Sequence, residues 1–162
     1  MTFPIEASCQ CGQVSYVLKS APLKVFACHC SECQKLSTSP FSVTAMVDAN
    51  DIEFSGELGE WRRKADSGNI NGAKFCTGCG NRIYHFSPSD MSIIKLKLKP
   101  IAADTAYLFE PQVHVWVSEK QSWYEIRKGS RRLINNRKVL FKSLSRQGGE
   151  NSHLFRFALP YL

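Results

Sequence analysis

The seven cysteines constrain this chain more than any other feature, because all of them fall in three short groups. The densest group lies at residues 28–33 and reads C-H-C-S-E-C, with three thiols in six residues. A C-Q-C pair at residues 9–11 precedes it, and a C-T-G-C pair at residues 76–79 follows it. Thiols this close together indicate metal ligands or a redox cluster, and no cysteine is left over for a disulfide framework.

Length and composition favour one domain with a tail. A chain of 162 residues, 43% of them hydrophobic, is long enough for one core but short for two domains. No apolar stretch reaches the roughly 18 residues that cross a bilayer, so we expect no membrane partner. The first residues, M-T-F-P-I-E, lack the basic start and apolar run of a signal peptide. We therefore expect a cytoplasmic protein, in a reducing compartment where clustered thiols persist as metal ligands.

The net charge of +7 is concentrated at one end of the chain. Residues 127–162 carry nine Lys or Arg and one Glu, whereas residues 1–126 carry twelve Lys or Arg and thirteen Asp or Glu. Any attraction to nucleic acid or to an acidic partner therefore belongs to the tail. Leu133, Leu140 and Leu144 lie at helical spacing, which is compatible with a basic amphipathic helix there. We expect a zinc-binding domain at residues 1–126 and a basic extension at residues 127–162.

Short alternating segments separated by turn residues predict a mainly β fold of short antiparallel strands and hairpins. One helical turn is expected at residues 31–35, and the glycine-rich stretch around residues 56–72 is expected to form hairpins and loops. No long helical period is visible before residue 126. The expected strands lie at residues 13–18, 23–27, 41–47, 52–54, 81–86, 92–98, 113–117 and 123–126.

The seven thiols divide into four and three. The two pairs can together complete a tetrahedral four-cysteine zinc site, the closed arrangement of a structural metal. Glycines within and after the second pair permit the tight turn of a zinc knuckle. The other three thiols leave a fourth zinc position open, as catalytic sites do. The expected structural ligands are Cys9, Cys11, Cys76 and Cys79. The expected open site consists of Cys28, Cys30 and Cys33, which gives two Zn²⁺ per chain.

The order and spacing of these motifs resemble the glutathione-dependent formaldehyde-activating enzyme family, which also includes centromere protein V. The similarity covers residues 5–126, with C-x-C-G at 9–12, C-H-C-x-x-C at 28–33 and F-C-x-x-C-G at 75–80. It implies a β-tent fold, a structural zinc on the paired cysteines and a labile catalytic zinc on the other three. It also implies carbon–sulfur lyase activity, which joins formaldehyde reversibly to glutathione as S-hydroxymethylglutathione. The basic tail is not part of the family pattern.

The charge of the open site favours a thiol substrate. Three thiolates on Zn²⁺ leave a net charge of −1, so bound water is a poorer acid there than at a three-histidine site. A substrate thiol suits the soft site better, because it can bind zinc, lose its proton and attack a small aldehyde. Alternatively, the metal can act as a Lewis acid on the hemithioacetal oxygen. The sequence leaves both roles open.

Other residues near the motifs have a structural interpretation beside a functional one. His29 is expected to be structural or to support the ligands rather than to carry protons, and His85 and His114 to be core or surface residues. Glu32 is a candidate general base but is expected to be an exposed turn acid. The tryptophans Trp61, Trp116 and Trp123 are expected in the core. Three cations can meet the carboxylates of glutathione: Arg62, Arg63 and Lys64. A charged loop usually faces water instead.

Two further interpretations of the cysteines and tail remain. In the first, both metals are structural and the basic tail contacts nucleic acid or an acidic partner, which predicts steeply salt-dependent binding. In the second, the thiols hold an iron–sulfur cluster, although the division into four and three fits two mononuclear sites better. The tail shows no aromatic interleaving of the kind that stacks on bases, and a solvated appendage is its simplest interpretation.

Overall fold

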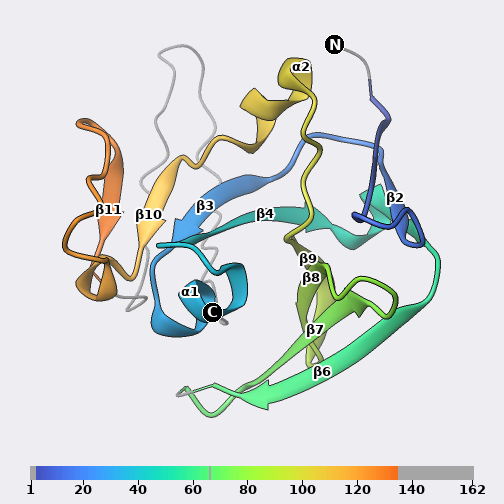
Figure 1. Ribbon diagram of the computed structural model, residues 1–162, viewed down its shortest axis with the longest axis horizontal. Helices are drawn as coiled ribbons and strands as arrows, with labels where there is room; N and C mark the ends of the chain where they lie inside the picture. Colours follow the sequence, from blue (N-terminus) through green and yellow to red (C-terminus); the bar gives the residue numbers. More distant parts are fainter. Residues whose placement is uncertain (1–2, 66, 135–162) are drawn as a thin grey trace, which may run out of the picture.

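Two sheets account for most of the computed structural model, which describes residues 3–65 and 67–134. The larger sheet has the strand order β11-β10-β3-β4-β9-β8-β7-β6. Figure 1 shows it passing from β11 at the left, through β3 and β4, to β6 at the bottom. Its strands are β3 (Lys24–Cys28), β4 (Ser42–Asp48), β6 (Leu58–Lys64), β7 (Ile70–Cys76), β8 (Arg82–Ser87), β9 (Asp90–Leu96), β10 (Val113–Val115) and β11 (Arg131–Leu133).

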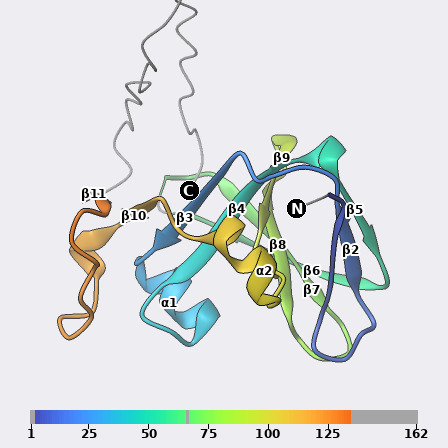
Figure 2. The same ribbon diagram turned by 90° about the horizontal axis from the view of Figure 1, so that it is seen from above.

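The smaller sheet has three antiparallel strands in the order β1-β2-β5. In Figures 1 and 2 it lies on the side of the molecule away from β10 and β11. Its strands are β1 (Ile5–Ser8), β2 (Ser15–Leu18) and β5 (Ile52–Ser55). The helices of the described chain are short: α1 (Ser31–Ser37), α2 (Ala103–Ala106) and 3₁₀ turns at Ala49–Asp51, Tyr107–Phe109 and Val117–Glu119.

The main core draws buried side chains from both sheets. Tyr16 and Leu18 come from the small sheet, and Ala45, Ile83 and Leu96 from the large one, all at 1% exposure or less. Side chains alternate along a strand, so the neighbours of these residues point to the other face of the large sheet. That other face carries a second, smaller apolar cluster, formed around Phe26, Cys28, Val113 and Val115.

Most of the expected strands are confirmed, and the protein is mainly β. The helical turn expected after Cys30 is present as α1. Residues 123–126 were expected to form a strand and do not, because Tyr124 instead packs its ring against Phe41 and His29. Within the glycine-rich region, β6 and β7 form one seven-residue antiparallel pair, longer than the expected short hairpins.

One edge of the large sheet departs from the expected antiparallel pairing. The strand β10 runs parallel to both β3 and β11. It joins β3 at the residues that lead to the densest cysteine group, with Val115 opposite Cys28. The long connections before and after β10 make the parallel arrangement feasible, since a parallel pair cannot be closed by a tight hairpin.

The basic end of the chain is only partly described. Leu133, expected in an amphipathic helix, lies in β11, and Leu140 and Leu144 lie outside the described residues. The boundary proposed at residue 126 stays a prediction, although β11 beyond it pairs with β10. In the described part of the chain, no helix is long and apolar enough to cross a membrane.

Candidate metal and thiol sites

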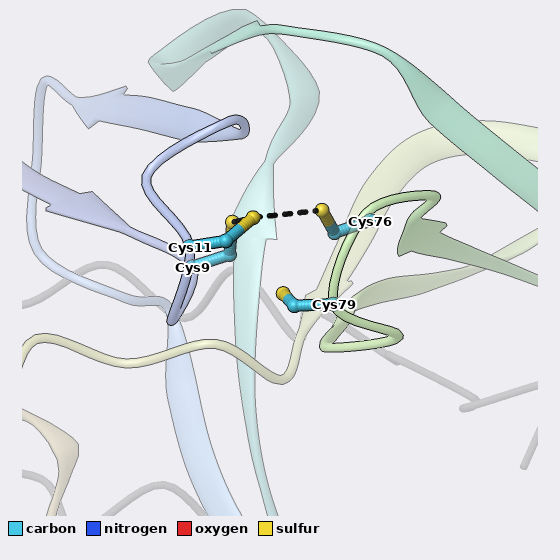
Figure 3. A group of neighbouring side chains, drawn as sticks. All are labelled: Cys9, Cys11, Cys76 and Cys79. Atoms are coloured by element: carbon cyan, nitrogen blue, oxygen red, sulfur yellow. Dashed lines mark hydrogen bonds between the residues drawn. The ribbon is translucent and has the colours of Figure 1, made fainter.

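Four thiols from two turns meet between the sheets. Cys9 and Cys11 belong to the turn after β1, while Cys76 ends β7 and Cys79 lies in the turn before β8. Figure 3 shows the side chains of the two turns pointing toward one another. The Sγ atom of Cys11 is 3.6 Å from those of Cys9 and Cys76. The structure therefore joins the two pairs that the sequence analysis grouped together.

Backbone groups stabilise the thiolate form in these turns. The Val14 N–H donates to Cys9 Sγ over 3.3 Å, and this hydrogen bond lowers the pKa of Cys9 to about 6. The pKa of Cys79 is also lowered, mainly by the backbone N–H of Asn81. Gly80 has φ of 72°, the left-handed conformation that glycine adopts without strain. This geometry is that of a knuckle folded around anionic sulfur.

The four-thiol group fits a tetrahedral zinc ion. Zn–S bonds of about 2.3 Å at tetrahedral angles place sulfur atoms about 3.8 Å apart. The observed separations of 3.6 Å are close to this value, and all four Sγ atoms lie within 4.8 Å of one another. The same separations are far longer than the S–S bond of a disulfide. That these residues bind zinc stays a prediction.

Three thiols meet at the end of β3. Cys28 is the last residue of that strand, Cys30 precedes α1, and Cys33 lies in its first turn. The Sγ atoms of Cys28 and Cys30 are 3.5 Å apart, and the three Sγ atoms lie within 4.8 Å of one another. Cys28 is buried, whereas the other two are partly exposed. This donor set fits three positions of a tetrahedral zinc ion, with the fourth left for a substrate.

The three thiols share their protons unequally. Hydrogen bonds from Cys28 and Cys30 lower the pKa of Cys33 to about 3, and the positive charges of Lys97 and Arg63 act in the same direction. The pKa of Cys28 is raised, because Cys30 and Cys33 compete with it to be the thiolate. Cys33 is therefore the thiolate of the group, whereas the pKa values of Cys28 and Cys30 are raised and both would have to lose a proton to a bound metal ion.

A lysine faces the three thiols from the sheet. Lys97 follows β9, and its Nζ donates to Thr44 Oγ1 over 2.6 Å and to Ser42 Oγ over 3.2 Å. Ser42 is the partner of Cys28 in the pairing of β3 with β4. Burial lowers the pKa of Lys97, and the negative charge of Cys33 opposes this effect. An ammonium ion here offsets the net charge of −1 expected for Zn²⁺ with three thiolates.

His29 lies away from the thiols on either side of it. It is fully buried, and its Nε2 is 2.9 Å from Nδ1 of His114, with the two rings stacked. Phe41 and Tyr124 pack against the same ring. Burial lowers the pKa of both histidines, so the pair is neutral near pH 7. These contacts agree with a structural role for His29 and His114.

The other candidates are scattered. Glu32 is partly exposed and pairs with Lys35, and Arg62 pairs with Glu60 on β6. Arg63 is close enough to Cys33 to influence its pKa. Trp61 and Trp123, expected in the core, are 49% and 69% exposed. Trp61 lies on β6, the edge strand of the large sheet, and Trp123 lies in a turn, so neither ring is covered by the core. Lys64 is also exposed, whereas Trp116 packs on the cluster that contains the three thiols.

Sequence reasoning missed the cations on the sheet face beside the three thiols. Lys95 and Lys97 belong to the alternating run K-L-K-L-K at residues 95–99, which was interpreted only as a strand. Lys95 is 8% exposed. The signal in the sequence was that every second residue of this run is a lysine, so one face of the strand is basic. Charged residues on a strand usually face water, so this pattern alone did not indicate a site.

The fold and the two thiol groups define a class: a β-rich domain with two cysteine clusters, one of four thiols and one of three, whose geometry fits metal binding. A family model described as glutathione-dependent formaldehyde-activating enzyme matches residues 4–119. The chain therefore belongs to this family. A crystal structure of a Rhodobacter sphaeroides protein is also similar, with 18% identity, a TM-score of 0.48, and coverage of 63% of this chain and 94% of that one.

Proposed function

We propose that this protein is a zinc-dependent carbon–sulfur lyase of the S-(hydroxymethyl)glutathione synthase type. It would join formaldehyde reversibly to glutathione or a related thiol. Membership of the family supports this reaction. The observation that carries it is the second thiol group: three cysteines beside a partly buried lysine, in addition to a four-thiol group. A protein that needed metal only for stability would have no use for an open position.

The reaction needs a thiolate and a polarised carbonyl. Zn²⁺ bound by Cys28, Cys30 and Cys33 would supply a soft Lewis acid that favours deprotonated sulfur. The substrate sulfur adds to the formaldehyde carbon and forms a C–S bond. The electron pair of the C=O bond moves to oxygen, which takes up the proton that the thiol released. No oxidant or reductant enters, and the reverse reaction breaks the same C–S bond.

The chain's own groups would set the electrostatics of this step. Lys97 is held by Thr44 and Ser42, so its positive charge is fixed beside the thiols. Its fixed charge stabilises negative charge on the nearby sulfur atoms, and it does not have to move to do so. All seven cysteines are free thiols, which agrees with a reducing compartment, and we propose a cytoplasmic location.

The test is the rate at which S-hydroxymethylglutathione forms from formaldehyde and glutathione, followed by NMR exchange between the free and adduct signals. We expect the zinc-loaded protein to raise the exchange rate above the uncatalysed one. Cys30→Ser is expected to lower the catalysed rate about 100-fold or more, because it removes a ligand of the open site. Ser31→Ala, next in the chain but with no cysteine ligand removed, is the matched control and should retain the rate. Equal rates with and without protein would refute the proposal.

A further inference from the structure

A row of side chains crosses the large sheet from the three thiols toward β7. Cys28 on β3 pairs with Ser42 on β4, and Ser42 receives a hydrogen bond from Lys97. The backbone N–H of Lys97 donates to the carbonyl of Ile83 over 2.8 Å, which places Lys97 beside Arg82 on β8. Arg82 in turn pairs with Phe75 on β7. At about 4.8 Å per strand, the backbone distance from Cys28 to Arg82 is roughly 14 Å.

The charge along this row is positive. Four cations, Lys97, Arg82, Lys95 and Arg63, are close enough to His85 to lower its pKa, and Arg82 also lowers the pKa of Lys97. Among the described residues that influence them, the negative charges are the cysteine thiolates, with Glu32 near Arg63 at the rim. An excess of cations on a partly buried face attracts anions and raises their local concentration.

Part of the hydrogen-bonding capacity of Arg82 is unused. Its Nε and Nη1 atoms are buried and have no hydrogen-bond partner within the described chain. The guanidinium lies near two aromatic rings, with its Cζ 5.9 Å from the ring centres of Trp61 and Phe75. Buried donors without partners destabilise a protein by about 1–3 kcal/mol each, so a native protein rarely retains them without a role. Nε2 of His85, on the same strand, is likewise buried and unpartnered.

We propose that Arg82, together with Lys97, forms a carboxylate subsite that holds the acid group of the thiol substrate while its sulfur lies at Cys28, Cys30 and Cys33. This inference rests on the proposed function and names its substrate class: a thiol that carries a carboxylate. The aromatic rings of Trp61 and Phe75 hold the guanidinium plane in place, and the missing acceptor is supplied by the substrate. Arg82 is therefore a binding residue, distinct from the exposed Arg62 and Lys64.

The experiment measures carboxylate preference directly. The zinc-loaded full-length protein is titrated calorimetrically with glutathione, which is long enough to extend from the thiols toward Arg82, and with its diethyl ester, which keeps the thiol but has no carboxylate. We expect the acid to bind about tenfold more tightly than the ester, the effect of one or two charge-assisted hydrogen bonds. In Arg82→Met the two affinities should become equal. Arg62→Met is the matched control. Arg62 is exposed and pairs with Glu60, so this variant should keep the preference for the carboxylate.

Each outcome decides a different point. A carboxylate preference that persists in Arg82→Met, or is absent from the wild type, overturns the subsite while leaving the thiol site intact. Failure of both thiols to bind contradicts the proposed function as well. The melting temperature gives a further check: a guanidinium retained only for its ring contacts predicts a less stable Arg82→Met, whereas a subsite predicts equal or greater stability without ligand.

Discussion

Lys97 is the residue that most clearly distinguishes the three-thiol group from a structural zinc site. Its ammonium group is fixed by Thr44 and Ser42 and faces thiols whose combined charge with Zn²⁺ would be −1. The four-thiol group shows no comparable lysine among its described contacts; there, backbone N–H groups and Gln13 surround the sulfur atoms. The two groups therefore differ in electrostatics as well as in the number of ligands.

Replacing this lysine should weaken metal binding at one site only. We expect Lys97→Met to lower the zinc affinity of the three-thiol group about 10- to 100-fold, the usual effect of losing a group that supports the ligands. The measurement is zinc transfer to a chromogenic chelator, which resolves a weak and a strong site. Lys19→Met, which removes an exposed lysine paired with Glu53, should leave both phases unchanged. Unchanged transfer in Lys97→Met would show that its charge does not act on the metal.

His85 should make the protein sensitive to acid. Burial lowers its pKa well below 6.5, with Lys97 and Arg82 adding repulsion. Because the unfolded chain binds a proton near pH 6.5 and the folded one does not, stability falls as pH drops below that value. The slope for one such group is about 1.4 kcal/mol per pH unit. Above pH 7.5 the effect is absent, since both states are neutral.

The check is urea unfolding of the wild type and His85→Gln between pH 5.5 and 7.5. The difference in free energy of unfolding should stay constant above pH 7 and move in favour of the variant below it. Both proteins hold the same cysteines, so acid release of metal affects them equally. If the free energies of unfolding of the wild type and of His85→Gln change with pH in the same way over the whole range, His85 takes up its proton equally well in the folded state, and the prediction is wrong.

At the scale of elements, the turn between β5 and β6 closes against the first cysteine turn. Gly56 has φ of 96°, and a Cβ placed on it would lie 2.0 Å from the backbone oxygen of Gln13. Backbone cannot yield as a flexible side chain does. This contact fixes the position of Gln13, whose side chain donates to Thr77 Oγ1 over 3.2 Å and so connects the two cysteine turns.

Alanine at Gly56 should therefore destabilise the protein more than its backbone strain alone. We expect Gly56→Ala to lower the free energy of unfolding by about 3 kcal/mol or more. Gly68 has a similar φ of 87° but open space around it, so Gly68→Ala should cost only about 1–2 kcal/mol. Urea unfolding of the two variants separates the effects of clash and strain. Equal losses would show that the clash with Gln13 is relieved elsewhere.

The sequence predicted elements best where pattern and burial agree. Strands β3 and β4 are largely buried, β3 on both faces, and their apolar segments were readable as strands. By contrast, β6 reads L-G-E-W-R-R-K and is mostly exposed or half-buried, so its pairing with β7 determines it rather than its own pattern. The parallel position of β10 depends on β3, some ninety residues earlier, and no local signal encodes such a pairing.

The candidate site shows the same division. The grouping of cysteines into four and three followed from their spacing, because each short motif acts as one unit. The cations beside the open group could not be placed, since Lys97 meets Cys28 only through the pairing of β3, β4 and β9. Likewise, the stacking of His29 on His114 joins two segments that are distant in sequence.

At the scale of the whole molecule, the basic tail decides between an enzyme and a binding module. If the lyase site is complete within the sheets, a chain ending at residue 134 should keep both metal ions and its rate within about twofold. This truncation retains β11 and removes five Lys or Arg with one Glu. The binding-module alternative instead predicts duplex DNA affinity that falls steeply with salt and is lost on truncation. Fluorescence anisotropy at several salt concentrations, beside the rate assay, separates the two.

The central claim is that one of two zinc sites is open and takes a thiol. The most direct test is the zinc content per chain of the intact protein and of Cys30→Ser, with thiol titration of the intact protein with and without glutathione. The account predicts two zinc ions in the intact protein and one in the variant, with glutathione changing the lability of the ion that the variant loses. Two tightly held zinc ions that are indifferent to glutathione would contradict the enzyme and favour a scaffold.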